Sequence, residues 1–281
     1  MERFDRNIRL FGAEGQKRIR ASHVAVIGCG GLGEHIVQQL ACLGVGTLTL
    51  VDDEELSETN RNRYVLAHNT DGIPGTDKVT IAARAVALVD PDIVVHPVRA
   101  ELRSEKTFTK LRHADTLFGC LDNDGARLVL NEFALAYEKQ YFDLATDVEQ
   151  EDALRYGGRV SLIGRGPGCL VCRGLIDPNE ARNELEDATA RKDRATIYGV
   201  DESLLDAVGP SVVSINGVVA SLAVTEFMVA TTGLRAPHRH LTYRGDLGVV
   251  IKNADSLQSD CYYCNVVQSA GERAGVERFV R

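Results

Sequence analysis

Apolar and polar residues follow a regular pattern in the first half of the chain, and this pattern predicts alternating strands and helices. Runs rich in β-branched residues predict buried strands at 23–27, 47–51, 92–98, 116–119 and 141–145. Apolar residues spaced three and four apart predict helices at 2–20, 36–43, 76–89, 104–113 and 126–138, the first of them broken near Gly12. This alternation predicts an α/β fold with a Rossmann-like, mostly parallel sheet and helices on both faces.

The pattern changes near residue 150. A strand at 154–163 and a hairpin at 240–252 predict a C-terminal antiparallel region, whereas the acidic residues 147–152 read as a loop. The densely charged segment 179–194 predicts an exposed, mobile crossover. The apolar run 212–230 is interrupted by Ser, Asn, Thr and Glu, which favours a buried helix over a membrane span. We therefore expect two regions, 1–150 and 151–281, within one continuous domain.

Residues 23–52 carry the pattern typical of a nucleotide-binding unit. The first strand leads into Gly28-Cys29-Gly30-Gly31-Leu32-Gly33, which fits G-x-G-x-x-G, and the second strand ends at Asp52. Bare backbone lets phosphates approach, and the N–H groups at the start of the following helix attract anions. The acid is placed to accept hydrogen bonds from a ribose. The predicted nucleotide contacts are Gly28, Gly30, Gly31, Gly33 and Asp52.

Composition narrows the class of protein. The chain has 281 residues and 44% hydrophobic content, which suits one large α/β domain. Its 40 acidic and 32 basic residues give a net charge of −8, so nucleic acid is not an expected partner. The N-terminal residues contain no apolar secretory segment. These features favour a cytoplasmic protein that does not enter a membrane.

Cations occur at two places near the expected ligand edge of the sheet. The polar loop 53–63 contains Asn60, Arg61 and Arg63, which either contact phosphates or belong to a mixed charged surface. Lys78 lies in the first turn of its predicted helix, where a cation opposes the helix dipole. That unfavourable placement indicates an anionic partner for the lysine.

Two further sets of charged residues each have two interpretations. Asp122 follows a predicted strand, where it either caps the next helix or holds Mg²⁺ beside a nucleotide. Arg3, Arg6 and Arg9 recur every third residue and share one face of the N-terminal helix. They form either a solvated basic face or a site at which one arginine reaches a phosphate.

Four of the seven cysteines form two C-x-x-C pairs, Cys169 with Cys172 and Cys261 with Cys264. Four thiolates suit a tetrahedral Zn²⁺, which would join the C-terminal strands to the segment after residue 168. A redox dithiol and an iron–sulfur cluster are the alternatives. A site closed by four thiolates has no open position, so we expect a structural and not a catalytic metal.

In their order along the chain, these motifs resemble those of ThiF/MoeB-like adenylyltransferases (HesA/MoeB/ThiF), which are relatives of the ubiquitin-activating enzymes. The similarity runs from about residue 2 to residue 264. The matching positions are Arg6, Gly12-Ala13-Glu14-Gly15-Gln16, Gly28–Gly33, Asn60-Arg61-Asn62-Arg63, Lys78, Asp122-Asn123 and both cysteine pairs.

The resemblance implies a reaction. In the family, the C-terminal glycine carboxylate of a small ubiquitin-like or sulfur-carrier protein attacks the α-phosphate of ATP, which gives an acyl-adenylate and pyrophosphate. By similarity, Arg63 and Lys78 contact the phosphates, Asp122 holds Mg²⁺ and Asp52 contacts the ribose. Asn60 and Asn123 are further implied nucleotide contacts.

The resemblance also implies a homodimer in which Arg6 reaches the ATP site of the other subunit. The expected catalytic residues are therefore Arg6, Arg63, Lys78 and Asp122. Relatives that form a thioester or persulfide carry a cysteine in the crossover, but no cysteine lies between Cys172 and Cys261. We expect adenylation alone, with a separate sulfurtransferase or conjugating enzyme for the next step. The strand around Arg159 and residues 179–208 are the expected contacts for a carrier tail that ends in Gly-Gly.

Three other functions compete with this interpretation. The glycine turn and Asp52 would also suit a dinucleotide-dependent oxidoreductase, although such an enzyme does not need the cations and Asp122 together. Adenylation of a small-molecule or tRNA-borne carboxylate would use the same site. A non-catalytic scaffold that docks a ubiquitin-like partner would not need the full set of charged residues.

Overall fold

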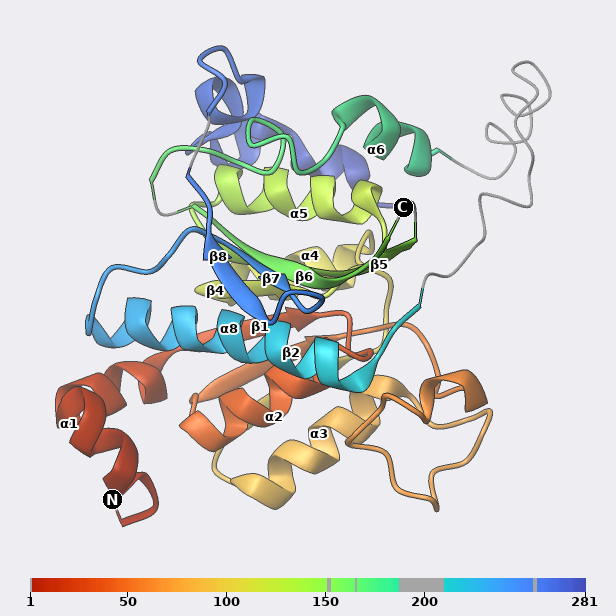
Figure 1. The fold of residues 1–281 in the computed structure, drawn as a ribbon, viewed down its shortest axis with the longest axis vertical. Helices are drawn as coiled ribbons and strands as arrows, with labels where there is room; N and C mark the ends of the chain where they lie inside the picture. Colours follow the sequence, from red (N-terminus) through yellow and green to blue (C-terminus); the bar gives the residue numbers. More distant parts are fainter. Residues whose placement is uncertain (1, 151–152, 165, 187–209, 255–256) are drawn as a thin grey trace.

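The computed structural model describes residues 2–150, 153–164, 166–186, 210–254 and 257–281, and it places them around one eight-stranded sheet (Figure 1). The strands are β1 (His23–Ile27), β2 (Thr47–Val51), β3 (Val94–Val98), β4 (Thr116–Gly119), β5 (Gln140–Gln150), β6 (Leu154–Ile163), β7 (His240–Arg244) and β8 (Val249–Lys252). The α-helices are α1 (Asp5–Ala21), α2 (Gly33–Leu43), α3 (Lys78–Val89), α4 (Glu105–His113), α5 (Asp124–Ala136), α6 (Pro178–Glu184) and α8 (Val213–Thr232). Shorter helical turns are η1 (Glu2–Phe4), η2 (Glu58–Asn60), η4 (Tyr263–Val267), η5 (Gly271–Ala274) and η6 (Val276–Phe279).

The sheet has the strand order β3-β2-β1-β4-β5-β6-β7-β8. Strands β1 to β5 pair in parallel, and β6 to β8 pair in antiparallel fashion. The predicted fold class is therefore confirmed. The chain leaves β1 towards β2 on one side and later returns to β4 on the other, so the strand order reverses between β1 and β4. Ligands of open α/β sheets bind at such a reversal, beyond the carboxyl ends of the strands.

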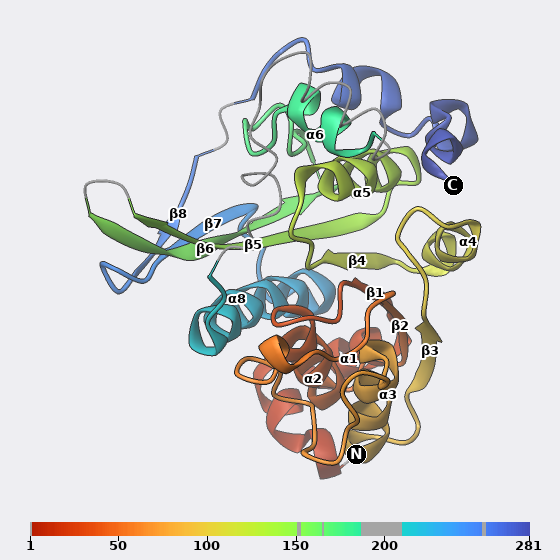
Figure 2. The same cartoon turned by 90° about the vertical axis from the view of Figure 1, so that its right-hand side faces the viewer.

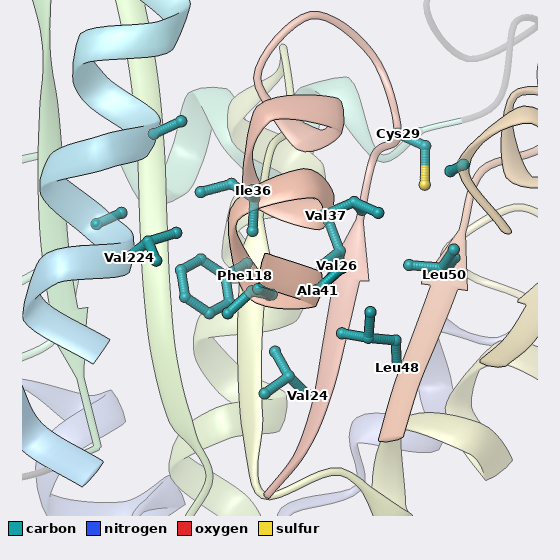
Figure 3. Close-up of a cluster of buried hydrophobic side chains, with 14 of the residues drawn as sticks. Val24, Val26, Cys29, Ile36, Val37, Ala41, Leu48, Leu50, Phe118 and Val224 are labelled. Atoms are coloured by element: carbon teal, nitrogen blue, oxygen red, sulfur yellow. The ribbon is translucent and has the colours of Figure 1, made fainter. Parts of the chain in front are cut away.

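Helices bury the two faces of the sheet in separate cores. Helices α2, α3 and α8 cover one face, and Figure 3 shows Ile36 and Val37 of α2 beside Val26 and Phe118 of the sheet. Helices α4 and α5 cover the other face, together with the cysteine-bearing segments and the C-terminal turns. The buried Val276 and Phe279 tie the C-terminal residues into this second core.

The β5–β6 hairpin differs from the sequence-based expectation. Strand β5 continues to Gln150, so residues 147–150 are paired with β6 and the prediction of a loop there is wrong. Figure 2 shows this part of the hairpin extending beyond the helices. Because no helix covers it, a strand there needs no apolar face, and its polar sequence resembles that of a loop. Strands β5 and β6, which lie on either side of position 150 in the sequence, pair with each other in the same sheet.

Helix α8 is the one described helix that is long and apolar enough to cross a membrane, with a mean hydropathy of 1.6, but half of that stretch is buried within the fold. It packs on the sheet against β5 and β6 and against α1 and α2. This arrangement agrees with the predicted buried helix. Helix α1 is kinked at Gly12, where φ is 77°, as the break in its pattern predicts. Of the predicted charged crossover 179–194, residues 179–186 are described and lie mostly in α6. The rest of this crossover, and residues 187–208 of the segment expected to contact a carrier tail, lie outside the described ranges.

Candidate active site

The glycine turn between β1 and α2 is too tight for side chains. Gly28 has φ of 88°, and a Cβ atom there would lie 2.4 Å from the carbonyl oxygen of Cys120, just beyond β4. A Cβ atom on Gly33 would lie 1.9 Å from the Gly28 carbonyl oxygen. These contacts explain why both positions require glycine. They also place the turn at the reversal of strand order, with the N-terminus of α2 open to an anion.

Asp52 holds this turn in place from the end of β2. Its carboxylate accepts a hydrogen bond from the Cys29 backbone N–H at 2.7 Å and another from the Glu54 backbone N–H at 2.9 Å. Burial raises the pKa of the Asp52 carboxyl, and the nearby Lys78 ammonium opposes that rise. The predicted ribose contact is thus located beside the glycine turn, where one oxygen already fixes the backbone of the turn.

Lys78 is buried at the first position of α3, with 5% of its surface exposed. Its ammonium group pairs with the carboxylate of Glu54, whose side chain is 67% exposed. The anionic partner that its position indicates is therefore present within the chain in this structure. An exposed carboxylate can move aside, so Lys78 is available to a phosphate that replaces Glu54.

The polar loop after β2 brings Arg63 to the glycine turn. The Arg63 side-chain carbons pass 3.3 Å from the position that a Cβ on Gly31 would occupy. Its guanidinium donates to the Thr59 carbonyl oxygen at 2.6 Å and to Asn62 Oδ1 at 3.3 Å. Those partners leave further N–H groups of the guanidinium for an anion.

The two neighbours of Arg63 in the motif shape the loop. Asn60 Oδ1 accepts a hydrogen bond from the Ser57 backbone N–H at 3.2 Å, which closes a capping box around η2. Arg61 donates to the carbonyl oxygens of His68 and Asp71 at 3.1 and 2.8 Å. Arg61 therefore braces the loop from within, which gives it a structural role.

The end of β4 separates the two interpretations of Asp122. Asn123, and not Asp122, caps α5, because its Oδ1 accepts a hydrogen bond from the Ala126 backbone N–H at 2.8 Å. The Asp122 side chain is exposed and accepts a hydrogen bond from the Asn123 amide at 3.1 Å. Because helix capping does not require Asp122, its carboxylate is available to hold a cation. It lies two residues beyond Cys120, which contacts Gly28.

A groove of about 570 Å³ begins at Asp122 and runs over β6 and β7. Residues 155–159 of β6 line it, with the bare Gly157 between Arg155 and Arg159. Opposite them in register, Thr242 and Arg244 of β7 complete the floor. The predicted contact strand around Arg159 therefore lines a basic groove that adjoins Asp122.

A buried carboxylate beneath this groove was not identified from the sequence. Asp143 of β5 is fully buried and lies 3.4 Å from the Arg159 guanidinium and 3.7 Å from that of Arg127. Tyr141 donates its hydroxyl hydrogen to Asp143 at 2.9 Å. The carboxylate raises the pKa of the half-buried Arg127 against the effect of its own burial. A charged residue inside an apolar strand requires such partners, and that was the available signal.

Asn216 was also missed. It lies in the first turn of α8, and its amide nitrogen is 2.6 Å from where a Cβ on Gly31 would lie. This nitrogen donates to Ser211 Oγ at 3.1 Å, and its amide oxygen accepts from Thr146 Oγ1 at 3.2 Å. The start of α8 therefore packs against the glycine turn and links it to β5. No local pattern distinguishes this asparagine from other polar residues in α8.

Arg6 is not brought to this site within one chain. Its side chain is exposed on α1, close to Phe4, whose ring contacts Gly44 at the C-terminal end of α2. The glycine turn lies at the opposite end of α2, a helix about 16 Å long by its rise per residue. Neighbouring Arg3 and Arg9 are engaged in ion pairs with Asp90 and Asp5.

The four paired cysteines converge as the sequence predicts. Their sulfur atoms all lie within 4.8 Å of one another, with Cys169 to Cys261 at 3.6 Å and Cys172 to Cys264 at 3.8 Å. Four sulfurs at about 2.3 Å from a tetrahedral zinc ion lie about 3.8 Å apart, so the cluster fits this ion. The Cys169 N–H also donates to Cys172 Sγ at 3.0 Å.

The comparisons with known proteins agree with this arrangement. The sequence profile described as the ThiF family matches residues 4–250. The "SAMP-activating enzyme E1" of Haloferax volcanii is 37% identical over 134 residues, which are 47% of this chain and 49% of that protein. The "Molybdopterin-synthase adenylyltransferase" of Salmonella typhimurium is 37% identical over 133 residues, which are 47% of this chain and 53% of that protein. The matched segment thus spans about half the length of these relatives.

A solved structure extends the likeness of the fold over nearly the whole chain. The crystal structure of E. coli MccB with MccA-N7isoASN superimposes with a TM-score of 0.72 and covers 94% of this chain and 75% of the MccB chain. The sequence identity in this superposition is 19%, so the likeness concerns the fold.

Proposed function

Because this chain belongs to the ThiF family, we propose that it is an ATP-dependent adenylyltransferase that acts in the cytoplasm on a small ubiquitin-like or sulfur-carrier protein. A carboxylate oxygen at the carrier's C-terminal glycine attacks the α-phosphorus of ATP. A new carboxyl–phosphate bond forms, the bond between the α-phosphorus and the bridging oxygen breaks, and pyrophosphate leaves with the electron pair. The relatives named for SAMP and for molybdopterin synthase support this choice of substrate class.

One observation carries the proposal: a groove for an extended chain adjoins a site suited to a nucleotide. The glycine turn, Asp52 and Arg63 meet at the reversal of strand order. Asp122 borders both this region, through Cys120, and the basic groove over β6 and β7. A carboxylate at the end of a peptide in the groove would therefore approach a nucleotide held at the turn.

The cations supply what the reaction requires. An attack by a carboxylate on a triphosphate brings anions together, so positive charge must stabilise the crowded transition state. Arg63 lies across Gly31, and Lys78 is held in a buried position at the start of α3. We assign both to the phosphates, with Glu54 giving way to them, and we assign Asn60 and Asn123 to the ordering of their loops around the nucleotide.

Asp122 is the residue that would hold the Mg²⁺ that accompanies ATP. Its exposed carboxylate is a hard oxygen ligand, and helix capping leaves it free for this use. The cation would neutralise charge on the phosphates. The chain itself contributes the position of the carboxylate, which the Asn123 amide orients.

The groove suits a tail that ends in Gly-Gly. Gly157 leaves the floor bare between two arginines, and a Cβ atom there would lie 1.9 Å from the Tyr243 carbonyl oxygen. Glycines in the tail could approach this bare backbone closely, and the arginines would attract its carboxylate. Asp143 holds Arg159 in place from below.

Two assignments complete the proposed enzyme. Zn²⁺ at the four cysteines has a structural role, because four sulfur ligands would leave the metal no open position. The active unit is a homodimer in which Arg6 of one chain reaches the nucleotide of the other. With no cysteine between Cys172 and Cys261, the adenylate passes to a separate sulfurtransferase or conjugating enzyme.

Trapping of the adenylate tests the proposal. The purified protein would be incubated with MgATP, a Gly-Gly-terminated carrier and hydroxylamine, and the carrier examined by intact mass spectrometry. We expect the mass of the C-terminal hydroxamate, and none with a carrier whose C-terminus is an amide. Absence of hydroxamate across a panel of free-acid carriers would contradict the assigned substrate class.

A further inference from the structure

Glu34 is a fully buried acid that no step above uses. It lies in the first turn of α2, directly after Gly33, and its backbone N–H donates to the Gly30 carbonyl oxygen at 3.0 Å. The residue is therefore part of the structure that forms the glycine turn. A carboxylate so close to a phosphate site is unfavourable for anion binding, which calls for an explanation.

One carboxyl oxygen of Glu34 connects the turn to the loop that carries Arg63. Oε2 accepts a hydrogen bond from the Leu66 backbone N–H at 3.1 Å, three residues beyond Arg63. The Leu66 carbonyl oxygen accepts a second hydrogen bond from Arg84 at 3.3 Å, and Arg84 also pairs with Asp71. Leu66 is thus fixed on both sides of its backbone, and Glu34 supplies the contact on the side of the glycine turn.

The other oxygen, Oε1, is buried and has no hydrogen-bond partner among the described residues. Arg63 and Tyr64 are the charged and titratable groups that face this carboxyl. Burial raises the pKa of Glu34 to about 8, although hydrogen bonding to the backbone of Leu66 and Val65 and, to a smaller extent, the Arg63 charge favour the carboxylate. Nucleotide phosphates at the turn would add negative charge nearby and engage Arg63, and both effects favour the protonated acid.

We propose that Glu34 is a positioning residue for nucleotide binding, which holds the Arg63 loop over the glycine turn and, at a pH where it is ionised in the free protein, takes up a proton from solvent when the phosphates bind. This inference rests on the proposed nucleotide site. When Oε1 carries the proton, Glu34 is neutral and still accepts the Leu66 hydrogen bond at Oε2. The loop therefore stays in place while the unfavourable charge is removed.

The sign of the pH dependence follows from the proton uptake. At pH values well below 8 the free protein already carries the proton, so the affinity for nucleotide does not depend on pH through this group. Above pH 8 the proton must be taken from solvent, so affinity should fall by up to about tenfold per pH unit. Glu34→Gln is permanently neutral and keeps an acceptor for Leu66, so its affinity should not show this fall.

Calorimetric titration of the full chain with MgATP tests the proposal. At about pH 8.5, in Tris and in a buffer of lower ionisation enthalpy, the binding enthalpy of the wild type should differ by an amount that corresponds to uptake of a fraction of a proton. Glu34→Gln should lose this buffer dependence and still bind. Glu34→Ala, which lacks the Leu66 acceptor, should bind at least about tenfold more weakly.

Glu132→Gln is the matched control. Glu132 is also buried, and burial raises the pKa of its carboxyl. It lies on α5, on the opposite face of the sheet from α2, and pairs with Arg278 near the C-terminus. It should retain the buffer dependence of the wild type. Equal proton uptake by the wild type and Glu34→Gln would overturn the proposal. Failure of the wild type to bind ATP at any pH would instead contradict the proposed nucleotide site itself, and the inference with it.

Discussion

Asp52 at the end of β2 and Cys29 in the glycine turn are joined by a hydrogen bond of 2.7 Å from the Cys29 backbone N–H to the Asp52 carboxylate. The two residues belong to adjacent parallel strand ends, so this bond fixes the turn against the sheet. The carboxylate that we assign to the ribose therefore also determines the shape of the phosphate site. We therefore expect binding of the sugar and binding of the phosphates to be coupled through this side chain.

Substitution of Asp52 should therefore affect nucleotide binding more than loss of one ribose contact would. We expect Asp52→Ala to raise the Kd for ATP by about 10- to 100-fold, since hydrogen bonds to a charged group contribute about 1.5–3 kcal/mol each. Asp53→Ala, which changes the exposed neighbouring acid, should bind ATP as the wild type does. Isothermal titration of both variants measures the difference, and equal Kd values would contradict the role of Asp52.

Two adjacent residues after β4, Asp122 and Asn123, should differ in what their substitution changes: the first affects activity, and the second affects stability. Asp122→Asn should reduce adenylate formation by about 100-fold or more, because the Mg²⁺ ligand is lost, while the melting temperature stays unchanged. Asn123→Ala removes the α5 cap and should lower the free energy of unfolding by about 1 kcal/mol. Thermal unfolding and hydroxamate trapping separate the two effects. Substantial turnover by Asp122→Asn would contradict its assignment.

Removal of metal should destabilise the fold. The purified protein should contain about one zinc ion per chain, and Cys264→Ser or chelation should lower the melting temperature by about 10 °C or more. Cys42→Ser, which changes an exposed cysteine on α2, should leave both the zinc content and the melting temperature unchanged. Elemental analysis and calorimetry make both measurements. A metal-free preparation with the normal melting temperature would exclude a structural zinc.

The position of Arg6 at the far end of α2 leads to a prediction about mixed dimers. Arg6→Ala and Lys78→Ala should each be inactive alone, because each removes a cation from every site. In a heterodimer, the site with intact Lys78 can receive Arg6 from the other chain. An equimolar random mixture should therefore regain about a quarter of the wild-type activity, since about half of the dimers are mixed and each has one intact site. Heterodimers verified by mass that show no activity would contradict a contribution in trans.

Local patterns were sufficient for most of the fold. The glycine turn, the strands β1, β2 and β4 and the paired cysteines all carry their signal within a few neighbouring residues, and the structure places them as predicted. The hairpin arm beyond residue 146 was misread because it is polar on both sides. Periodicity reports burial, and a strand that buries neither face leaves no such signal.

The site residues that the sequence did not identify depend on contacts between distant segments. Asp143 meets Arg159 and Arg127 across strands, and Asn216 reaches Gly31 from a helix that begins almost two hundred residues later in the chain. Conversely, Asn60, Arg61 and Asn123 belong to the family motif, and the structure gives each of them hydrogen bonds that order its own loop or helix. A motif marks which residues matter, whereas only the structure separates those that brace a loop from those that face the groove.

We have proposed that this chain activates the terminal carboxylate of a carrier protein, and ATP–pyrophosphate exchange measures this activation step itself. The purified protein would be assayed with MgATP and labelled pyrophosphate, with and without a carrier that ends in Gly-Gly. We predict exchange that depends on the carrier and disappears when its terminal carboxylate is blocked. A protein that binds ATP and yet shows no exchange with any carrier of a broad panel would contradict the proposed activation of a carrier.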